Sequence, residues 1–247
     1  MTHSPRFYFK PDQTKGGVVT LDEKESRHAI SVLRLEAGEA VDLFDGSGKQ
    51  FRGIVTGREK GRLLVALDKT EVRAVSQATQ ITLAVSVIRS ERMEFLIQKA
   101  CELGVTSIVP MLTQRSIVKL SSERWKSKIR RWEKIALESC KQCGRPTIPQ
   151  ILPVQSYKSF LEHANQSYDL LLIPTLALKG KTLSRALQGT RPKNLLALIG
   201  PEGDFSREEV DLAIACGATP VSLGPLVLRS ETAAIYLLSA LSFFYQN

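Results

Sequence analysis

The first part of the chain shows short apolar stretches separated by turn residues, a pattern typical of a β-rich domain. Ala40–Phe44 and Gln50–Val55 flank the glycine-containing turn Asp45–Gly48, which predicts a β-hairpin. Lys24–Arg34 instead has the spacing of a short helix. Further strands are predicted at Arg6–Phe9, Gly16–Leu21 and Arg62–Leu67. Several short strands separated by turns predict a small β-barrel.

The pattern changes after Glu71–Gln80, a polar segment without periodicity that we interpret as a linker. Beyond it, apolar runs alternate with amphipathic segments, and this alternation predicts a mostly parallel sheet with helices on both faces. We therefore expect two domains, residues 1–72 and 73–247. The predicted strands are Ile81–Ile88, Ser107–Pro110, Asp169–Pro174, Leu195–Ile199 and Pro220–Leu223, and the predicted helices are Glu91–Leu103, Ser121–Cys143, Ser156–Ala164, Thr182–Gln188, one beginning at Ser206, and Ser230–Tyr245.

The composition of the 247 residues is that of an ordinary globular protein, and no apolar run is long enough to span a bilayer. The first residues lack the apolar core of a signal peptide. Cys140 and Cys143 form a C-x-x-C pair, but it falls late in a predicted helix and lacks the further ligands of a zinc site. We expect free thiols, no metal and a cytoplasmic location.

The net charge of +9 is concentrated in the middle of the chain. Residues 76–160 carry 14 Lys and Arg against 6 Asp and Glu, whereas the segments on either side are close to neutral. Such an excess suggests a polyanionic partner such as nucleic acid. A solvated basic helix face explains the same charge equally well, so the charge alone leaves both interpretations open.

Two glycine-containing turns follow apolar runs near the C-terminus. Leu195–Ile199 leads into the turn Gly200–Gly203, and Val221–Leu223 leads into a second turn that ends at Arg229. Ligands of open α/β sheets bind outside the carboxyl ends of the strands. The first turn matches neither common glycine-rich phosphate motif, and the acidic residues that follow it favour a neutral or cationic ligand over a phosphate. By itself, this first turn is most simply an ordinary strand-to-helix connection.

Arg229 and Glu231 form a charged pair at the predicted start of the last helix. Two interpretations stand side by side: a structural ion pair, or an arginine that binds a substrate anion beside a glutamate that orients or accepts a proton.

The motifs together resemble one class of enzymes. Gly-Pro-Glu-Gly-x-Phe at Gly200–Phe205 is followed by Leu-Gly-x-x-x-Leu-Arg-x-Glu-Thr-Ala at Leu223–Ala233. This pair is similar to the SPOUT class of S-adenosylmethionine-dependent RNA methyltransferases and, within it, to the RsmE family, which methylates N3 of a uridine in small-subunit (16S) ribosomal RNA. Asp204 departs from the glycine usual in that family. Similar motifs occur in the same order along nearly the whole chain: Arg6–Phe9, His28–Arg34, Glu94–Pro110, Gln114–Ser116 and Ile135–Arg145.

The resemblance implies a PUA-like RNA-binding barrel followed by a SPOUT domain with a trefoil knot, and a homodimer. It also implies a bent S-adenosylmethionine held by three loops. The expected cofactor-binding residues are Ile173, Pro174, Thr175, Ile199, Gly200, Pro201, Glu202, Gly203, Leu223, Gly224, Leu228, Arg229 and Thr232. The expected RNA-contacting residues are Arg6, His28, Arg34, Arg115, Gln142 and Arg145.

The chemistry of this reaction suits the residues present. Methyl transfer from a sulfonium needs an in-line nucleophile and no metal, and uridine N3 becomes a good nucleophile only when it loses its proton. Catalysis then rests on positioning and on stabilising the uridine anion, for which Arg229 is the candidate, with Glu231 as candidate base or orienting group. A SPOUT methyltransferase acting on a ribose 2′-hydroxyl of rRNA or tRNA, and a non-catalytic ribosome assembly factor that binds RNA, are the alternatives.

Overall fold

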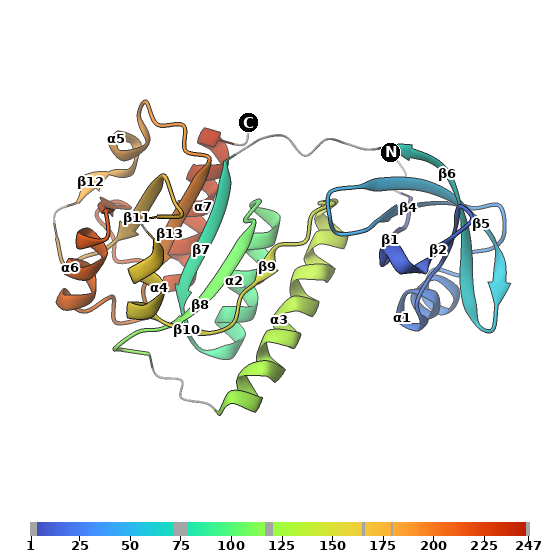
Figure 1. Ribbon diagram of the computed structural model, residues 1–247, viewed down its shortest axis with the longest axis horizontal. Helices are drawn as coiled ribbons and strands as arrows, with labels where there is room; N and C mark the ends of the chain where they lie inside the picture. Colours follow the sequence, from blue (N-terminus) through green and yellow to red (C-terminus); the bar gives the residue numbers. More distant parts are fainter. Residues whose placement is uncertain (1–3, 72–78, 117–120, 165, 179, 246–247) are drawn as a thin grey trace. The chain divides into compact units, whose positions relative to one another are not determined.

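The computed structural model describes residues 4–71, 79–116, 121–164, 166–178 and 180–245. The chain divides into two compact units (Figure 1). The first comprises Met1–Ser76 together with Cys140–Ile148, and the second comprises Gln77–Ser139 together with Pro149–Asn247. Most of the linker expected at Glu71–Gln80 lies outside the described residues.

The first unit is built on one six-stranded sheet, in the order β1-β4-β5-β6-β3-β2. All neighbours are antiparallel except β1 and β4, which are parallel. One face buries an apolar cluster that includes Phe7, Val41 and Val65. The strands are β1 (Arg6–Tyr8), β2 (Thr14–Lys15), β3 (Val18–Thr20), β4 (Ala40–Phe44), β5 (Gln50–Glu59) and β6 (Arg62–Glu71), and the helical turns are η1 (Pro11–Gln13), α1 (Glu23–Arg27) and the π-type η2 (His28–Val32).

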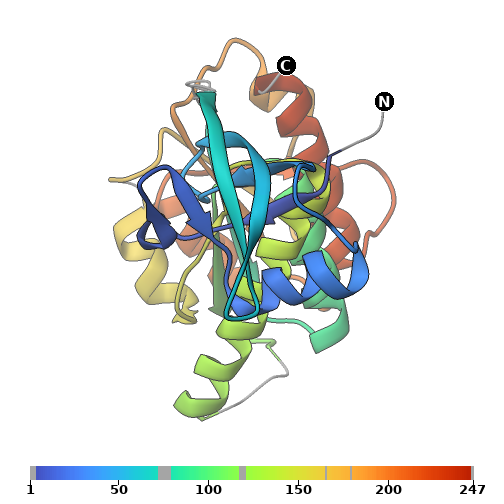
Figure 2. The ribbon, with the colours of Figure 1, turned by 90° about the vertical axis from the view of Figure 1, so that its right-hand side faces the viewer.

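The hairpin predicted between β4 and β5 is confirmed, and β5 continues into a longer hairpin with β6. Figure 2 shows this second hairpin as a long twisted ribbon. Lys60 and Gly61 join the two strands, both with positive φ (48° and 78°), the geometry that tight hairpin turns require. The strands therefore run to Glu59 and Glu71, further than the apolar pattern alone indicated, because backbone pairing carries them beyond the buried positions.

Residues 140–148 return to the first unit. Lys141 Nζ donates to both oxygens of the buried Glu25 carboxylate, at 2.7 and 3.0 Å. Thr147 bridges to Gly46, where a Cβ would lie only 2.8 Å from Ile148 Cδ1. A side chain at position 46 would therefore have to displace Ile148 and would be strained by a φ of +80°. Nothing in the hydrophobic pattern of the sequence signals this return.

The second unit contains the predicted parallel sheet, so the α/β class is confirmed. Its strands run in the order β10-β8-β7-β13-β11-β14-β12, with β9 also paired to β8, and the pairings are all parallel. These strands are β7 (Gln80–Ser86), β8 (Ser107–Leu112), β9 (Gln150–Ile151), β10 (Gln155–Ser156), β11 (Leu170–Pro174), β12 (Lys181–Thr182), β13 (Asn194–Ile199) and β14 (Ala218–Ser222).

Helices cover the two faces of this sheet (Figure 1). α4 and α6 pack on one face, where Leu196 and Leu198 of β13 join an apolar cluster with Leu161 and Val210. α2 and α7 pack against each other on the opposite face. Consecutive residues of β13 are buried because alternate side chains point to opposite faces of the sheet and both faces are covered. The helices are α2 (Ser90–Glu102), α3 (Ser122–Cys143), α4 (Tyr157–Ala164), α5 (Leu183–Leu187), α6 (Arg207–Ala215) and α7 (Ser230–Tyr245).

Local sequence signals explain several of these boundaries. The predicted start of α6 at Ser206 is confirmed, and a capping box forms it: the Ser206 hydroxyl accepts from Glu209 N, and the Glu209 carboxylate accepts from Ser206 N. Gly104 follows α2 with a φ of +84°. In the part of the chain that the structure describes, no helix is long and apolar enough to span a membrane.

The strands near the middle of the sheet are not neighbours in the order in which they occur in the chain. β13 lies between β7 and β11, and β14 lies on the other side of β11. The carboxyl ends of β11, β13 and β14 are therefore neighbours, a place where open α/β sheets bind ligands. The trefoil knot stays a prediction.

Candidate functional site

A cavity of about 310 Å³ opens at the carboxyl ends of β11, β13 and β14. Three segments form its walls: the end of β11 with the residues after it, the turn Gly200–Asp204 after β13, and the loop after β14 that leads into α7. The lining residues are Pro174, Thr175, Leu176, Ile199, Gly200, Pro201, Glu202, Gly203, Asp204, Val221, Ser222, Leu223, Gly224, Leu226, Val227, Leu228, Ser230 and Ala233.

The turn Gly200–Asp204 is held by close packing. A Cβ on Gly200 would lie 3.1 Å from both the backbone nitrogen and the ring of Phe205. The Phe205 ring is buried and packs against Tyr157, whose hydroxyl donates to Glu209 O at 2.8 Å. Burial raises the pKa of that Tyr157 hydroxyl far above its ordinary value, so it stays neutral. Any side chain at position 200 would therefore have to displace Phe205 by a few tenths of an ångström.

Asp204 joins this turn to the segment after β11. Its Oδ2 accepts from the Thr175 hydroxyl at 3.1 Å and from Leu176 N at 2.8 Å, and its Oδ1 accepts from Phe205 N at 2.8 Å. The residue has a φ of +60°, a conformation that aspartate tolerates better than most side chains. The aspartate that departs from the family pattern therefore links two walls of the cavity.

The loop after β14 has a different character. Leu226 and Val227 are 73% and 77% exposed although both line the cavity. The hydrogen bonds recorded for its first residues join the Ser222 hydroxyl to Gly224, whose φ is +118°. This wall presents apolar side chains to solvent.

Arg229 and Glu231 do not pair with each other. The Arg229 side chain is exposed, whereas the Glu231 side chain is only 12% exposed. Glu231 Oε1 lies 3.8 Å from Arg92 Nε, and Arg92 Nη1 lies 3.7 Å from Glu202 Oε1. Glu231 Oε2 is buried, and no hydrogen bond to it is recorded within the described ranges.

Sequence reasoning missed Arg92. It lies in the first turn of α2, far from both glutamates in the sequence. Its only signal is its place beside the buried face of an amphipathic helix, which many structural arginines share.

Most of the expected cofactor residues lie together around the cavity. Ile173 is buried within β11, and Arg229 and Thr232 are exposed; these three do not line it. The residues that do are Pro174, Thr175, Ile199, Gly200, Pro201, Glu202, Gly203, Leu223, Gly224 and Leu228. The lining also includes residues that were not expected: Leu176, Asp204, Val221, Ser222, Leu226, Val227, Ser230 and Ala233.

Five of the six expected RNA-contacting residues lie in the first unit. The Arg6 guanidinium stacks over the Phe44 ring at 4.6 Å and donates to Gln50 Oε1 at 3.0 Å. His28 lies edge-on to the buried Phe7 ring, with 6.3 Å between ring centroids. Arg34 and Gln142 are exposed, and Arg145 is half-buried.

The sixth, Arg115, belongs to the second unit and is exposed. Its Nη1 donates to the Gly203 carbonyl oxygen, so it supports the turn of the cavity from outside.

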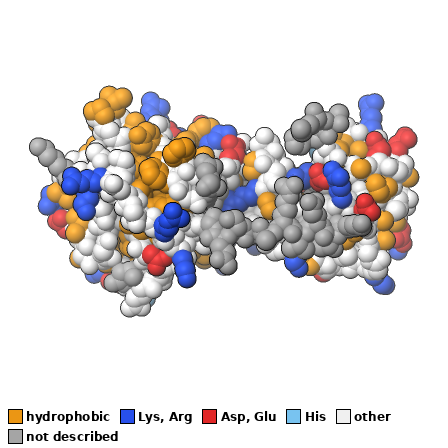
Figure 3. All heavy atoms as spheres, turned by 90° about the horizontal axis from the view of Figure 1, so that it is seen from above, with side chains coloured by type: hydrophobic (Ala, Val, Ile, Leu, Met, Phe, Trp, Pro, Cys, Tyr) orange, Lys and Arg blue, Asp and Glu red, His pale blue; other side chains and the backbone are white. Residues whose placement is uncertain are grey.

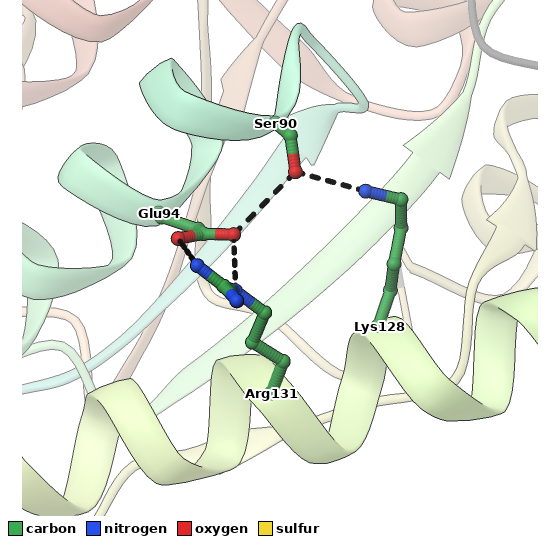
Figure 4. A network of polar contacts seen from close by, with 4 residues as sticks. All are labelled: Ser90, Glu94, Lys128 and Arg131. Carbon is green, nitrogen blue, oxygen red and sulfur yellow. Dashed lines mark hydrogen bonds and ion pairs between the residues drawn. The ribbon is translucent and has the colours of Figure 1, made fainter.

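The basic residues of α3 fall into two groups. Lys128 donates to the Ser90 hydroxyl at 2.9 Å, and Arg131 binds both oxygens of Glu94 at 2.6 and 2.7 Å (Figure 4). The hydrogen bond from Arg131 lowers the pKa of Glu94. Lys126, Arg130 and Lys134 form the other group: they are exposed, and in the described part of the chain no ion pair is recorded for them. Some of the positive charge in the middle of the chain is thus used in contacts within the protein, and some is exposed and able to contact a partner.

Hydrophobic side chains also gather on the surface of the second unit (Figure 3). On α7, Tyr236, Phe243 and Phe244 are 51%, 71% and 47% exposed. A search of the described residues finds no group of His, Cys, Asp and Glu that is able to hold a metal ion.

Known protein families match most of the chain. A family model described as an RNA methyltransferase domain matches residues 75–242, and one described as an RNA methyltransferase PUA domain matches residues 21–68. Ribosomal RNA small subunit methyltransferase E of Bacillus subtilis is 27% identical over 224 residues, which cover 89% of this chain and 88% of that protein.

Solved structures are similar over nearly the whole chain. A methyltransferase of Legionella pneumophila in complex with the cofactor SAM is 36% identical with a TM-score of 0.88, covering 98% of both chains. Ribosomal RNA small subunit methyltransferase E from Neisseria gonorrhoeae, bound to S-adenosyl methionine, is 32% identical with a TM-score of 0.86, covering 97% of both chains.

Proposed function

The chain belongs to the RNA methyltransferase family and, within it, groups with ribosomal RNA small subunit methyltransferase E, and from that premise we propose that it methylates N3 of a uridine in 16S rRNA. S-adenosylmethionine is the methyl donor. The observation that carries the proposal is the cavity at the ends of β11, β13 and β14, because it unites ten of the thirteen expected cofactor residues.

The cavity has the properties that this donor needs. Ile199, Leu223 and Leu228 supply apolar walls for an adenine, while exposed backbone in the Gly200–Gly203 turn supplies hydrogen-bonding groups. Glu202 and Asp204 place negative charge at the cavity, which suits a sulfonium cation and disfavours a phosphate.

Catalysis requires loss of the uridine N3 proton and stabilisation of the resulting anion. Glu231 is the proposed proton acceptor or orienting group, because its buried Oε2 has no recorded hydrogen bond in the described residues, and a buried acceptor without a partner is costly. Arg229 is the proposed anion-stabilising cation, since its exposed side chain, two residues from Glu231, is open to an incoming substrate.

The RNA would be bound by residues of both units: Arg6, His28, Arg34, Gln142 and Arg145 in the first, and Arg115 in the second. Contacts of the arginines to phosphates would supply most of the affinity. Lys126, Arg130 and Lys134 of α3, for which the described residues record no ion pair, add positive charge of the kind that a polyanion attracts.

The proposal extends to assembly and location. We assign residues 1–72 to an RNA-binding PUA-like domain and residues 73–247 to the methyltransferase domain. The proposed location of the protein is the cytoplasm, where its rRNA substrate is made. A homodimer is supported by the exposed Tyr236, Phe243 and Phe244 of α7, which a second copy would cover. Sedimentation of the purified chain checks this, and a monomer at micromolar concentration would contradict it.

The test is transfer of a labelled methyl group from S-adenosylmethionine to 30S subunits or to naked rRNA, followed by mapping with mass spectrometry. We expect one methyl group on N3 of one uridine. A methyl group on a ribose would replace the proposal with 2′-O-methylation, and RNA binding without transfer would favour an assembly factor.

Glu231→Gln tests the catalytic assignment. It should lower the transfer rate by about 10²-fold, the low end for loss of a general base, while cofactor affinity changes little. Glu91→Gln, an exposed change in the first turn of α2, is the matched control.

A further inference from the structure

Arg92 lies between two carboxylates that belong to different walls of the cavity. Glu202 belongs to the turn after β13 and lines the cavity, whereas Glu231 lies in the first turn of α7, directly after the loop that forms the other wall. The Arg92 side chain is 33% exposed, and its two ion pairs, at 3.7 and 3.8 Å, use different nitrogens of the same guanidinium.

The helix that carries Arg92 is firmly seated. Met93 and Leu96 are fully buried, and α2 packs against α7. On the outer side of α2, Glu94 is bound by Arg131 of α3 (Figure 4). Arg92 therefore projects from a fixed element toward one carboxylate in the turn after β13 and another in the first turn of α7.

The local charges need this arginine. Without it, two carboxylates would share one site with no recorded counter-ion, and like charges in a partly buried site repel each other. With it, Glu231 Oε1 faces a cation, and the buried Oε2 is left without a recorded partner in the described chain.

We propose that Arg92 is a positioning residue, which sets the distance between the two walls by holding Glu202 and directs Glu231 toward the substrate by holding its Oε1. The inference rests on the proposed function, since it supplies the support for the cofactor cavity and for the proposed proton acceptor.

The geometry favours arginine over lysine at this position. The planar guanidinium presents separate nitrogens to the two carboxylates, whereas an ammonium is a single point charge. Arg92→Lys is therefore expected to restore part of what Arg92→Gln loses, whereas Arg92→Met, which has a similar length and no charge, is expected to restore none of it.

Cofactor binding tests the first half of the inference. In calorimetry, Arg92→Gln should lower the affinity for S-adenosylmethionine about fivefold, which is the upper end of what a partly exposed ion pair contributes. The affinity for S-adenosylhomocysteine, which lacks the sulfonium charge, should fall at least as much, because the effect acts through the shape of the walls and only S-adenosylmethionine gains from the released Glu202 charge. Arg89→Gln, an exposed arginine three residues earlier, should bind as the wild type does. Thermal unfolding of each variant verifies its fold.

A double-mutant cycle tests the route of the effect. If Arg92 acts through Glu202, Arg92→Gln should change cofactor affinity less than twofold in a Glu202→Gln background. Methyl transfer measured over a range of cofactor concentrations tests the second half. Arg92→Gln should lower kcat about tenfold, because Glu231 is released, whereas Glu202→Gln should change mainly the KM for the cofactor.

Two results would overturn the inference: wild-type cofactor affinity in Arg92→Gln, or additive effects in the cycle. A wild-type chain that binds no S-adenosylmethionine would instead remove the proposed function itself, so the two failures are distinguishable.

Discussion

The two loops that face each other across the cavity are built in opposite ways. The Gly200–Asp204 turn is held by three sets of contacts. Phe205 packs against Gly200, Arg115 donates a hydrogen bond to the Gly203 carbonyl, and Asp204 accepts hydrogen bonds from the two residues that follow β11. The Leu223–Leu228 loop has few recorded bonds and leaves Leu226 and Val227 largely exposed. One wall is therefore preformed, and the other offers apolar surface.

The difference indicates a division of roles. A preformed wall lowers the ordering cost of binding and fixes the orientation of a ligand. An apolar wall gains free energy only when a ligand or a second subunit covers it. Changes in the first wall should therefore affect fold and binding together, and changes in the second should affect binding alone.

The largest effect is expected at Gly200. Gly200→Arg should abolish detectable S-adenosylmethionine binding in calorimetry, because even a Cβ at this position lies 3.1 Å from Phe205. Gly203→Ala is the control in the same turn, since its Cβ would meet only Arg115 Cδ at 3.5 Å, an ordinary contact. Equal affinities for the two variants would mean that the turn is not preformed.

Asp204→Ala should come next. It removes three hydrogen bonds to a carboxylate, so we expect a loss of about 2 kcal/mol in the free energy of unfolding and weaker cofactor binding. Denaturant unfolding and calorimetry measure the two effects. Asp204→Asn keeps one acceptor oxygen and tolerates positive φ, so it should lose less. Loss of affinity without loss of stability would show that Asp204 contacts the ligand rather than the wall.

The second wall should behave differently. Leu226→Ser combined with Val227→Ser is expected to change the free energy of unfolding by less than about 0.5 kcal/mol, because both side chains are exposed. Cofactor affinity should nevertheless fall several-fold, since both residues line the cavity. A stability loss as large as that of Asp204→Ala would erase the contrast between the walls.

The smallest effect concerns the support of α2. The folded-state pKa of Glu94 is lowered by Arg131, so this pair stabilises the fold above the unfolded pKa of glutamate, about 4.3, and the contribution is lost as the pH falls through the lower folded-state value. Because Arg131 is 67% exposed, solvent screening keeps the contribution small. Glu94→Gln should therefore be slightly less stable than the wild type at pH 7 in denaturant unfolding, and the difference should shrink as the pH is lowered through the titration of Glu94. A difference that stays constant as the pH falls would contradict the assignment.

The secondary-structure elements and the fold class follow from local patterns in the chain. Hydrophobic periodicity predicted the strands β7, β8, β11 and β13, and the last helix agrees with its predicted limits at Ser230 and Tyr245. These features follow from local rules, since burial on two faces gives continuous apolar runs and the capping box at Ser206 is read from four residues. The family resemblance added the loops that surround the cavity, because their motifs are contiguous in the chain.

The folded arrangement, by contrast, sets which side chains meet. It placed Glu231 beside Arg92, which precedes it by more than a hundred residues, and left Arg229 exposed. It gave Asp204 its role as a tie between two loops, and it returned Lys141 to Glu25 of the first unit. Such pairs are set by the order of strands in the sheet and by the packing of α2 on α7, and neither leaves a periodic trace in the sequence. The local pattern fixes how each segment folds, and the partners of a charged side chain depend on where other segments are brought.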